Sequence, residues 1–185
     1  MRRAPLALLG AMLALAGCGI VAVEGQPEPA EIPSGPLRAV GNDAVGPITA
    51  VGSGRTLGIG WRYAVYDTAD GVCTQLEMSS VTSGGCGPAP LISEGSVFGG
   101  TGSGGGDPDG ASAFPTPVHG IVGSQVAEVS IVTESGQRFP TTLMSLASAG
   151  HDAQAFVGFV PEGETAASVV ASDAAGGALE TFDLR

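Results

Sequence analysis

Short segments in which apolar and polar residues alternate, separated by glycine-rich turns, constrain this chain more than any other feature. The clearest is 55–67, where Trp61 and Tyr63 fall on one face and Arg62 and Ala64 on the other. A period of two residues is that of a β-strand. Because strand aromatics usually bury their large apolar surface, we expect Trp61 in the core rather than exposed as a ligand-stacking platform.

The same pattern recurs at even spacing to the end of the chain. Residues 155–161 are apolar on both faces, which predicts a central strand. Asp70 and Gly71 lie between two apolar segments, which favours a tight hairpin. These features predict an all-β domain over 47–185, a single β-sandwich or partly open barrel of about seven to nine strands. Further strands are expected at 47–53, 72–78, 118–122, 125–134, 138–146, 165–173 and 178–184.

Residues 79–113 interrupt this series and are expected to form surface loops. The glycine run at 99–106 lacks the Gly-Lys-Ser/Thr ending of a P-loop, and no helical segment follows it. The stretch from Asp107 to Gly110 resembles the start of a calcium loop, but Pro108 interrupts it and no bidentate glutamate follows at the required distance. We therefore expect no cofactor here.

The N-terminus carries the most specific motif. Arg2 and Arg3 precede an apolar run that is short for a membrane span, and the run ends in four residues that resemble the lipobox of bacterial lipoproteins. The resemblance implies that a signal peptidase cleaves before the cysteine and that its thiol carries a diacylglyceryl group. The four positions are Leu15, Ala16 and Gly17 for peptidase recognition and Cys18 for lipidation.

Two alternatives to the lipobox remain open: an ordinary secretory signal in which Cys18 is incidental, and an uncleaved helix over about 4–23. On the lipobox interpretation, residues 1–17 are a signal peptide. Residues 18–46, rich in proline and glutamate, are then a flexible, disordered tether. The protein is expected on the extracytoplasmic side of the cell membrane, held by its lipid.

The remaining two of the three cysteines, Cys73 and Cys86, form an even pair in an oxidising compartment. A disulfide between them would close a loop of about 14 residues and contribute about 3 kcal/mol in the chain-entropy model. His119 and His151 do not lie at zinc-ligand spacing from these thiols, and the chain has no CxxC motif. We expect no metal site.

The net charge and the absence of catalytic motifs disfavour two classes of function, nucleic-acid binding and catalysis. The formal net charge of −11 disfavours binding to nucleic acid. No Gly-x-Ser-x-Gly elbow is present, and Asp152 is the only acid near either histidine, next to His151. No catalytic residue is therefore assigned. We expect a non-catalytic module that binds a protein, a peptide or an envelope polymer; the alternative is a small cell-envelope enzyme or enzyme inhibitor.

A second resemblance is carried by six positions or segments that extend over most of the domain: Trp61, Cys73, Cys86, 118–122, 159–161 and 173–180. Together they resemble uncharacterised extracytoplasmic domains of actinobacteria. The resemblance is diffuse, and it implies a β fold and an extracytoplasmic location without an activity or site residues.

Overall fold

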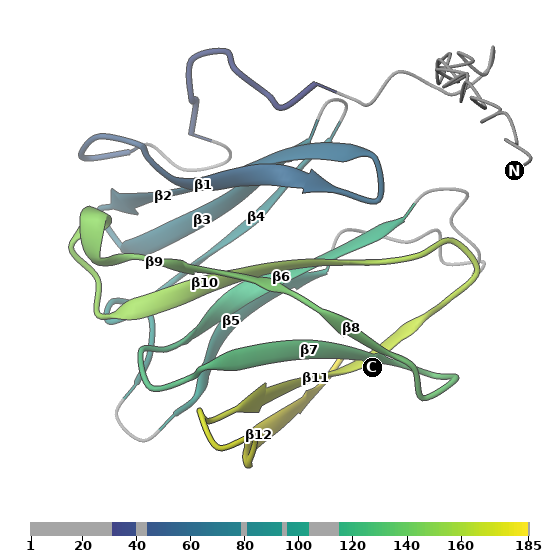
Figure 1. The fold of residues 1–185 in the computed structure, drawn as a ribbon. Helices are drawn as coiled ribbons and strands as arrows, with labels where there is room; N and C mark the ends of the chain where they lie inside the picture. The colour runs from purple at the N-terminus through teal and green to yellow at the C-terminus, as the bar shows by residue number, and fades with distance from the viewer. Residues whose placement is uncertain (1–30, 40–43, 79–80, 94–95, 104–114, 185) are drawn as a thin grey trace, which may run out of the picture.

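The computed structural model describes residues 31–39, 44–78, 81–93, 96–103 and 115–184. This part of the chain forms twelve strands and one short 3₁₀ helix, η1 (Ala147–Ala149), and contains no α-helix (Figure 1). All strand pairs are antiparallel, and they make three four-stranded sheets. The expectation of an all-β, sandwich-like fold is confirmed.

The three sheets are named A, B and C in chain order. Sheet A has the order β1 (Thr49–Thr56), β2 (Ile59–Thr68), β3 (Gly71–Met78), β4 (Thr82–Gly87). Sheet B has the order β5 (Phe98–Ser103), β6 (Thr116–Gly123), β10 (Ala153–Val160), β9 (Thr142–Ser145). Sheet C has the order β12 (Ala178–Asp183), β11 (Ala166–Ser172), β7 (Glu128–Thr133), β8 (Arg138–Pro140).

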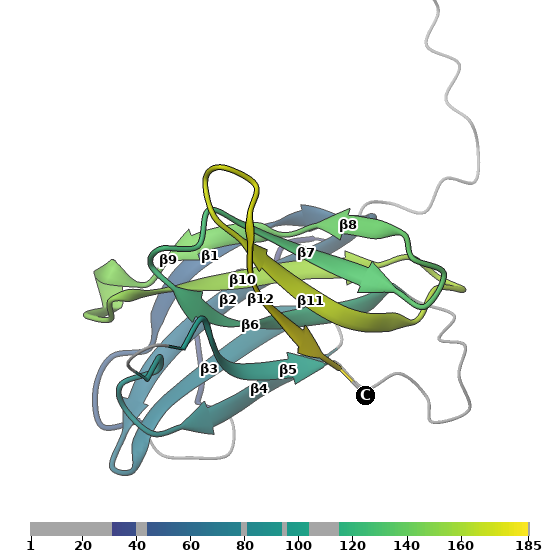
Figure 2. The ribbon, with the colours of Figure 1, turned by 90° about the horizontal axis from the view of Figure 1, so that it is seen from below.

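The sheets stack as three layers with sheet B in the middle, as Figure 1 shows. Seen from below in Figure 2, β11 and β12 lie in front of β6 and β10. Two apolar cores fill the two spaces between layers. The core between A and B is built on Trp61, Tyr63, Leu76, Ile121, Met144, Leu146, Ala153, Ala155, Val157 and Phe159. The core between B and C is built on Phe98, Val118, Val122, Val126, Val129, Ile131, Phe156, Val160, Val169 and Ala171.

Strand β10 shows why the middle layer needs apolar residues on both faces. Phe156 and Val160 belong to the core toward sheet C, whereas Val157 and Phe159 belong to the core toward sheet A. All four side chains are buried. The prediction of a central strand at 155–161 is confirmed, because successive side chains of a strand point to opposite faces.

The chain passes directly from sheet C to sheet B between β8 and β9, with only Thr141 separating the two strands. The hydroxyl of Thr141 donates a hydrogen bond to the carbonyl oxygen of Val129 (2.9 Å), which holds this crossing point against β7. The segment expected as one strand at 138–146 is therefore two strands in different sheets. A strand that changes sheet in this way closes one corner of a sandwich.

The prediction of a single strand over 55–67 is wrong at its N-terminal end, because β1 ends at Thr56 and β2 begins at Ile59. Leu57 and Gly58 have φ values of 50° and 79°, so they form a two-residue turn between β1 and β2. Positive φ at both central residues is the geometry of a type I′ hairpin turn, which the sequence signals most clearly with Asn-Gly. Trp61, on β2, lies in the core as expected, and its ring nitrogen donates to the hydroxyl of Thr56 (3.2 Å).

Two strands, β4 and β5, lie in the stretch that was expected to be loops. Both are rich in glycine, which has a low strand propensity. Their partners β3 and β6 are apolar and supply regular edges to pair with. These two strands and the crossing at Thr141 raise the number of strands above the expected seven to nine.

The described part of the expected tether includes residues 31–39. Arg62, on the face of β2 that points away from sheet B, donates a hydrogen bond from Nη1 to the carbonyl oxygen of Gly35 (2.8 Å). The same guanidinium forms an ion pair with Glu77 on β3, and both side chains are largely buried. This stretch of the expected tether is therefore in contact with sheet A.

Candidate functional site

The residues of the expected lipid anchor lie outside the described part of the chain. Leu15, Ala16, Gly17 and Cys18 all fall within 1–30, so their arrangement is not described. Among the described residues, no helix has the length and apolar character needed to cross a bilayer.

Cys73 and Cys86 are bonded, with an S–S distance of 1.98 Å. They face each other directly on β3 and β4, and their Cα atoms are 4.0 Å apart. Cys73 is buried and Cys86 is exposed. The disulfide expected from the sequence is present, and it joins the glycine-rich edge strand β4 to the apolar strand β3.

His119 lies at the buried interface between sheets A and B. Its Nε2 is 3.0 Å from the hydroxyl oxygen of Ser83 on β4, and its ring meets Tyr63 edge-on, with the centroids 5.7 Å apart. Its Nδ1 has no hydrogen-bond partner. A serine next to a histidine resembles a nucleophile–base pair, but in such a pair a third group hydrogen-bonds to Nδ1 and orients the ring.

Burial determines the ionisation of this cluster. Removal from water lowers the pKa of His119 to about 4, because the charged imidazolium loses its hydration. Burial also raises the pKa of Tyr63 above its usual range, with the side chain of Thr74 opposing the shift in part. His119 is therefore neutral near pH 7. A neutral, buried ring of this kind is a core residue that is out of reach of a substrate.

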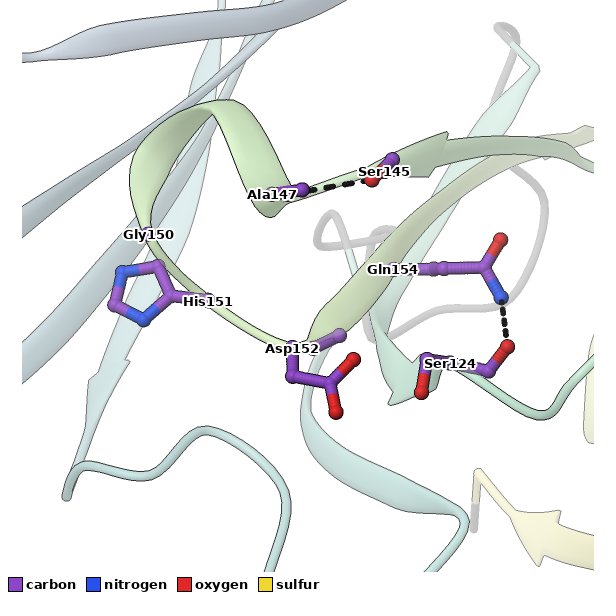
Figure 3. A pocket seen from close by; sticks show the side chains of 8 residues that line it. Ser124, Ser145, Ala147, Gly150, His151, Asp152 and Gln154 are labelled. Carbon is purple, nitrogen blue, oxygen red and sulfur yellow. Dashed lines mark hydrogen bonds between the residues drawn. The ribbon is translucent and has the colours of Figure 1, made fainter.

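The other histidine borders a surface hollow of about 510 Å³ (Figure 3). His151 Nε2 is 3.5 Å from a carboxylate oxygen of Asp67, and its ring points away from Ser124 and Ser145 in Figure 3. The hydroxyl of Ser145 already accepts a hydrogen bond from the backbone of Ala147 (3.3 Å). Histidine, serine and acid thus border one hollow without converging on a common point.

A second hollow lies where the edges of sheets A and B come together. Its volume is about 370 Å³, and we call it the β4–β5 groove. Strands β4 and β5 approach to within 8 Å (Cα–Cα) beside it without pairing. None of its described lining residues is titratable. They are Val72, Thr74, Gly84, Gly85, Cys86, Gly87, Pro88, Pro90, Leu91, Ser93, Phe98, Gly99 and Ile121.

The groove exists because β4 has no side chain at two positions that line it. Gly85 and Gly87 pair with Thr74 and Val72, which also line the groove. A Cβ atom added at Gly85 or Gly87 would meet no heavy atom within 4 Å. Any larger residue at these two positions would begin to fill the space.

The remaining motifs do not add a site. The glycine run at 99–106 supplies part of β5, up to Ser103, and the segment from Asp107 to Gly110 lies outside the described residues. No group of three or more His, Cys, Asp or Glu side chains suited to a metal ion occurs in the ranges that the structure covers.

Comparisons with protein-family models, with curated proteins and with solved structures found no match.

Sequence reasoning found the disulfide and the two histidines but missed the groove. Its one sequence signal is the pair of glycines at alternate positions of 82–87, Gly85 and Gly87. Alternate glycines leave one face of a strand without side chains. These two glycines predict a groove only when 82–87 is known to be a strand and the sheet opposite it is known.

Proposed function

We propose that this protein is a membrane-anchored extracytoplasmic lipoprotein whose β domain is a non-catalytic binding module at the cell surface. The observation that carries the binding role is the β4–β5 groove, which is uncharged and mostly apolar in its described lining. Ligand sites in proteins are typically concave and apolar with a few polar groups. Thr74 and Ser93 are such groups in this groove.

The arrangement of the reactive side chains also supports a binding role over the alternative of a small envelope enzyme. His119 is enclosed between two sheets, and His151 is turned toward Asp67 rather than toward a hydroxyl. General acid–base catalysis needs a group within hydrogen-bond reach of the substrate. Neither histidine is among the described residues that line the β4–β5 groove.

The binding role is tested by photo-crosslinking on intact cells. A photoreactive residue in place of Ala89, which is exposed between two prolines that line the groove, should give a discrete cross-linked product. The same residue in place of Thr181, exposed on β12 of sheet C, is the matched control and should not give that product. Identical products from both positions, or none from either, would contradict a role for the groove in binding at the cell surface.

The anchor is tested by the variant Cys18→Ala. Without the thiol no diacylglyceryl group can be attached, so we expect the protein to leave the membrane fraction, whereas the tether variant Gly25→Ala stays there. Two acyl chains give stable attachment because each buried methylene contributes about 0.8 kcal/mol. Full membrane retention of Cys18→Ala would instead favour the uncleaved helix over about 4–23.

A further inference from the structure

The edge of sheet A at β4 lacks the features that usually protect an exposed strand. Edge strands are commonly blunted by charges, prolines or bulges, or by being very short. The five other edge strands each have such a feature. Strands β1, β5 and β12 each show a register shift against their neighbour. Strand β8 is three residues long and contains Arg138 and Pro140, and β9 is four residues long. Strand β4 pairs with β3 over six consecutive residues without a shift, and it contains neither a charge nor a proline.

The pairing pattern shows which backbone groups of β4 face the free edge. The amide of Met78 donates to the carbonyl of Val81 (2.8 Å), so these two facing residues are a hydrogen-bonded pair of the hairpin. Hydrogen-bonded and non-hydrogen-bonded pairs alternate along an antiparallel ladder. Thr82, opposite Glu77, and Gly84, opposite Gln75, are thus in non-hydrogen-bonded pairs, and their N–H and C=O groups point away from β3.

The groove lies beside this edge. Gly84 and Gly85 both line it, so a strand added along β4 would run past its opening. Alternate side chains of the added strand would point toward sheet B, into the space that Gly85 and Gly87 leave empty. The described lining carries no charge, so it accepts an aliphatic side chain and penalises a charged one.

We propose that β4 and the β4–β5 groove together bind an extended peptide segment of a partner protein. The segment pairs with Thr82 and Gly84 as an additional strand, and one uncharged aliphatic side chain enters the groove. This is strand addition, in which main-chain hydrogen bonds supply affinity and a pocket for alternate side chains supplies specificity. The net charge of −11 favours basic residues on either side of the aliphatic anchor. The inference deepens the proposed binding role and rests on it.

The test is selection of a random seven-residue phage-displayed library on the purified full-length protein. We expect enriched peptides to share an aliphatic residue flanked by lysine or arginine.

The variant Gly85→Val fills the groove, and it should fold because a Cβ at this position meets nothing within 4 Å. It should lower the affinity of the enriched peptide at least tenfold. Gly46→Val is the matched control, since Gly46 is also exposed and open to a Cβ, and it should leave the affinity unchanged.

Backbone pairing is tested separately with the synthetic form of the enriched peptide. Methylation of alternate amide nitrogens removes the donors that face β4 and leaves every side chain in place, so we expect binding to be lost. Binding that survives both registers of methylation would overturn strand addition in favour of an apolar side-chain site alone. Enrichment that is equal on the wild type and on Gly85→Val would overturn the groove as the site.

The outcomes also separate this inference from the proposed function. If the cross-link at position 89 forms on cells and is unaffected by Gly85→Val, the binding role stands and peptide binding in the groove is wrong. If the library selects groove-dependent peptides but no product forms on cells, the peptide site stands and the cell-surface role is contradicted. Self-association of the wild type through β4, detected by sedimentation and abolished by Thr82→Pro, which removes an N–H that points away from β3, would replace the partner peptide with a second copy of the chain.

Discussion

At the scale of single residues, burial sets the protonation state of His119 and links it to stability. The pKa of its imidazole is lowered to about 4 by loss of hydration, against an ordinary value near 6.5 in the unfolded chain. Between these two values the unfolded state binds more protons than the folded state, so stability rises with pH. The contribution is fully present above about pH 6.5 and is lost as the pH falls toward 4.

We predict that His119→Gln removes this pH dependence. Glutamine can keep a hydrogen bond to Ser83, and it does not titrate. Between pH 7 and pH 4 the wild type should lose about 3 kcal/mol more of its free energy of unfolding than the variant does, as measured by urea unfolding at several pH values. Parallel losses in the two proteins would show that His119 is charged or hydrated in the folded state.

At the scale of elements, the β3–β4 hairpin joins a strand that buries much apolar surface to a strand that buries little. Strand β3 is mostly buried, whereas β4 is a glycine-rich edge with little apolar surface. The Cys73–Cys86 disulfide holds the second to the first across a sequence separation of 13 residues. It therefore positions the glycines that form the β4–β5 groove.

We predict that the double variant Cys73→Ala/Cys86→Ala loses about 3 kcal/mol of stability, which lowers Tm by roughly 6–12 °C. The physical reason is the greater conformational freedom of the unfolded chain without the cross-link. Differential scanning calorimetry with and without a reductant measures the effect. The reductant should lower the Tm of the wild type and leave that of the double variant unchanged; the opposite result would argue against a stabilising bridge.

Arg62 holds a second element, the chain at 31–39, against sheet A. Its guanidinium donates to the carbonyl of Gly35 and forms an ion pair with Glu77. Replacement by methionine keeps the apolar stem of the side chain but removes all of these donors. Loss of the contact to Gly35 frees this segment from the sheet.

We predict that Arg62→Met speeds trypsin cleavage after Arg38, which is exposed and three residues from Gly35. Cleavage after Arg138, on β8 of sheet C, serves as the internal control and should keep its rate. Mass spectrometry of the timed digest gives both rates. An unchanged rate at Arg38 would show that the contact does not restrain the segment.

At the scale of the whole molecule, sheet B couples the two apolar cores. Residues of β6 and β10 contribute to both cores, so neither outer sheet can separate without exposing apolar surface of the middle one. Exposure of that surface costs about 25 cal/mol for each Å². We therefore expect the three layers to unfold together.

We predict that Phe156→Ala destabilises all three layers at once. Phe156 is fully buried in the core between B and C, and its truncation should cost about 3–5 kcal/mol. Trp61 is the only tryptophan and lies in the other core, so its fluorescence reports the A–B interface. Fluorescence and far-UV circular dichroism should shift to the same lower denaturant midpoint. A fluorescence midpoint that stays at the wild-type value would show that the cores unfold separately.

The alternation of apolar and polar residues by itself determined the all-β class, the burial of Trp61 and the central place of 155–161, because a strand's side-chain period is local. The two cysteines left over after the expected lipobox likewise sufficed to predict the Cys73–Cys86 bridge. Local pattern could not determine that Thr141 carries the chain between sheets, or that glycine-rich β4 and β5 are strands. Those outcomes depend on edges supplied by distant partners. The β4–β5 groove belongs to the same class, since an empty position on a strand becomes a cavity only when another sheet lies opposite it.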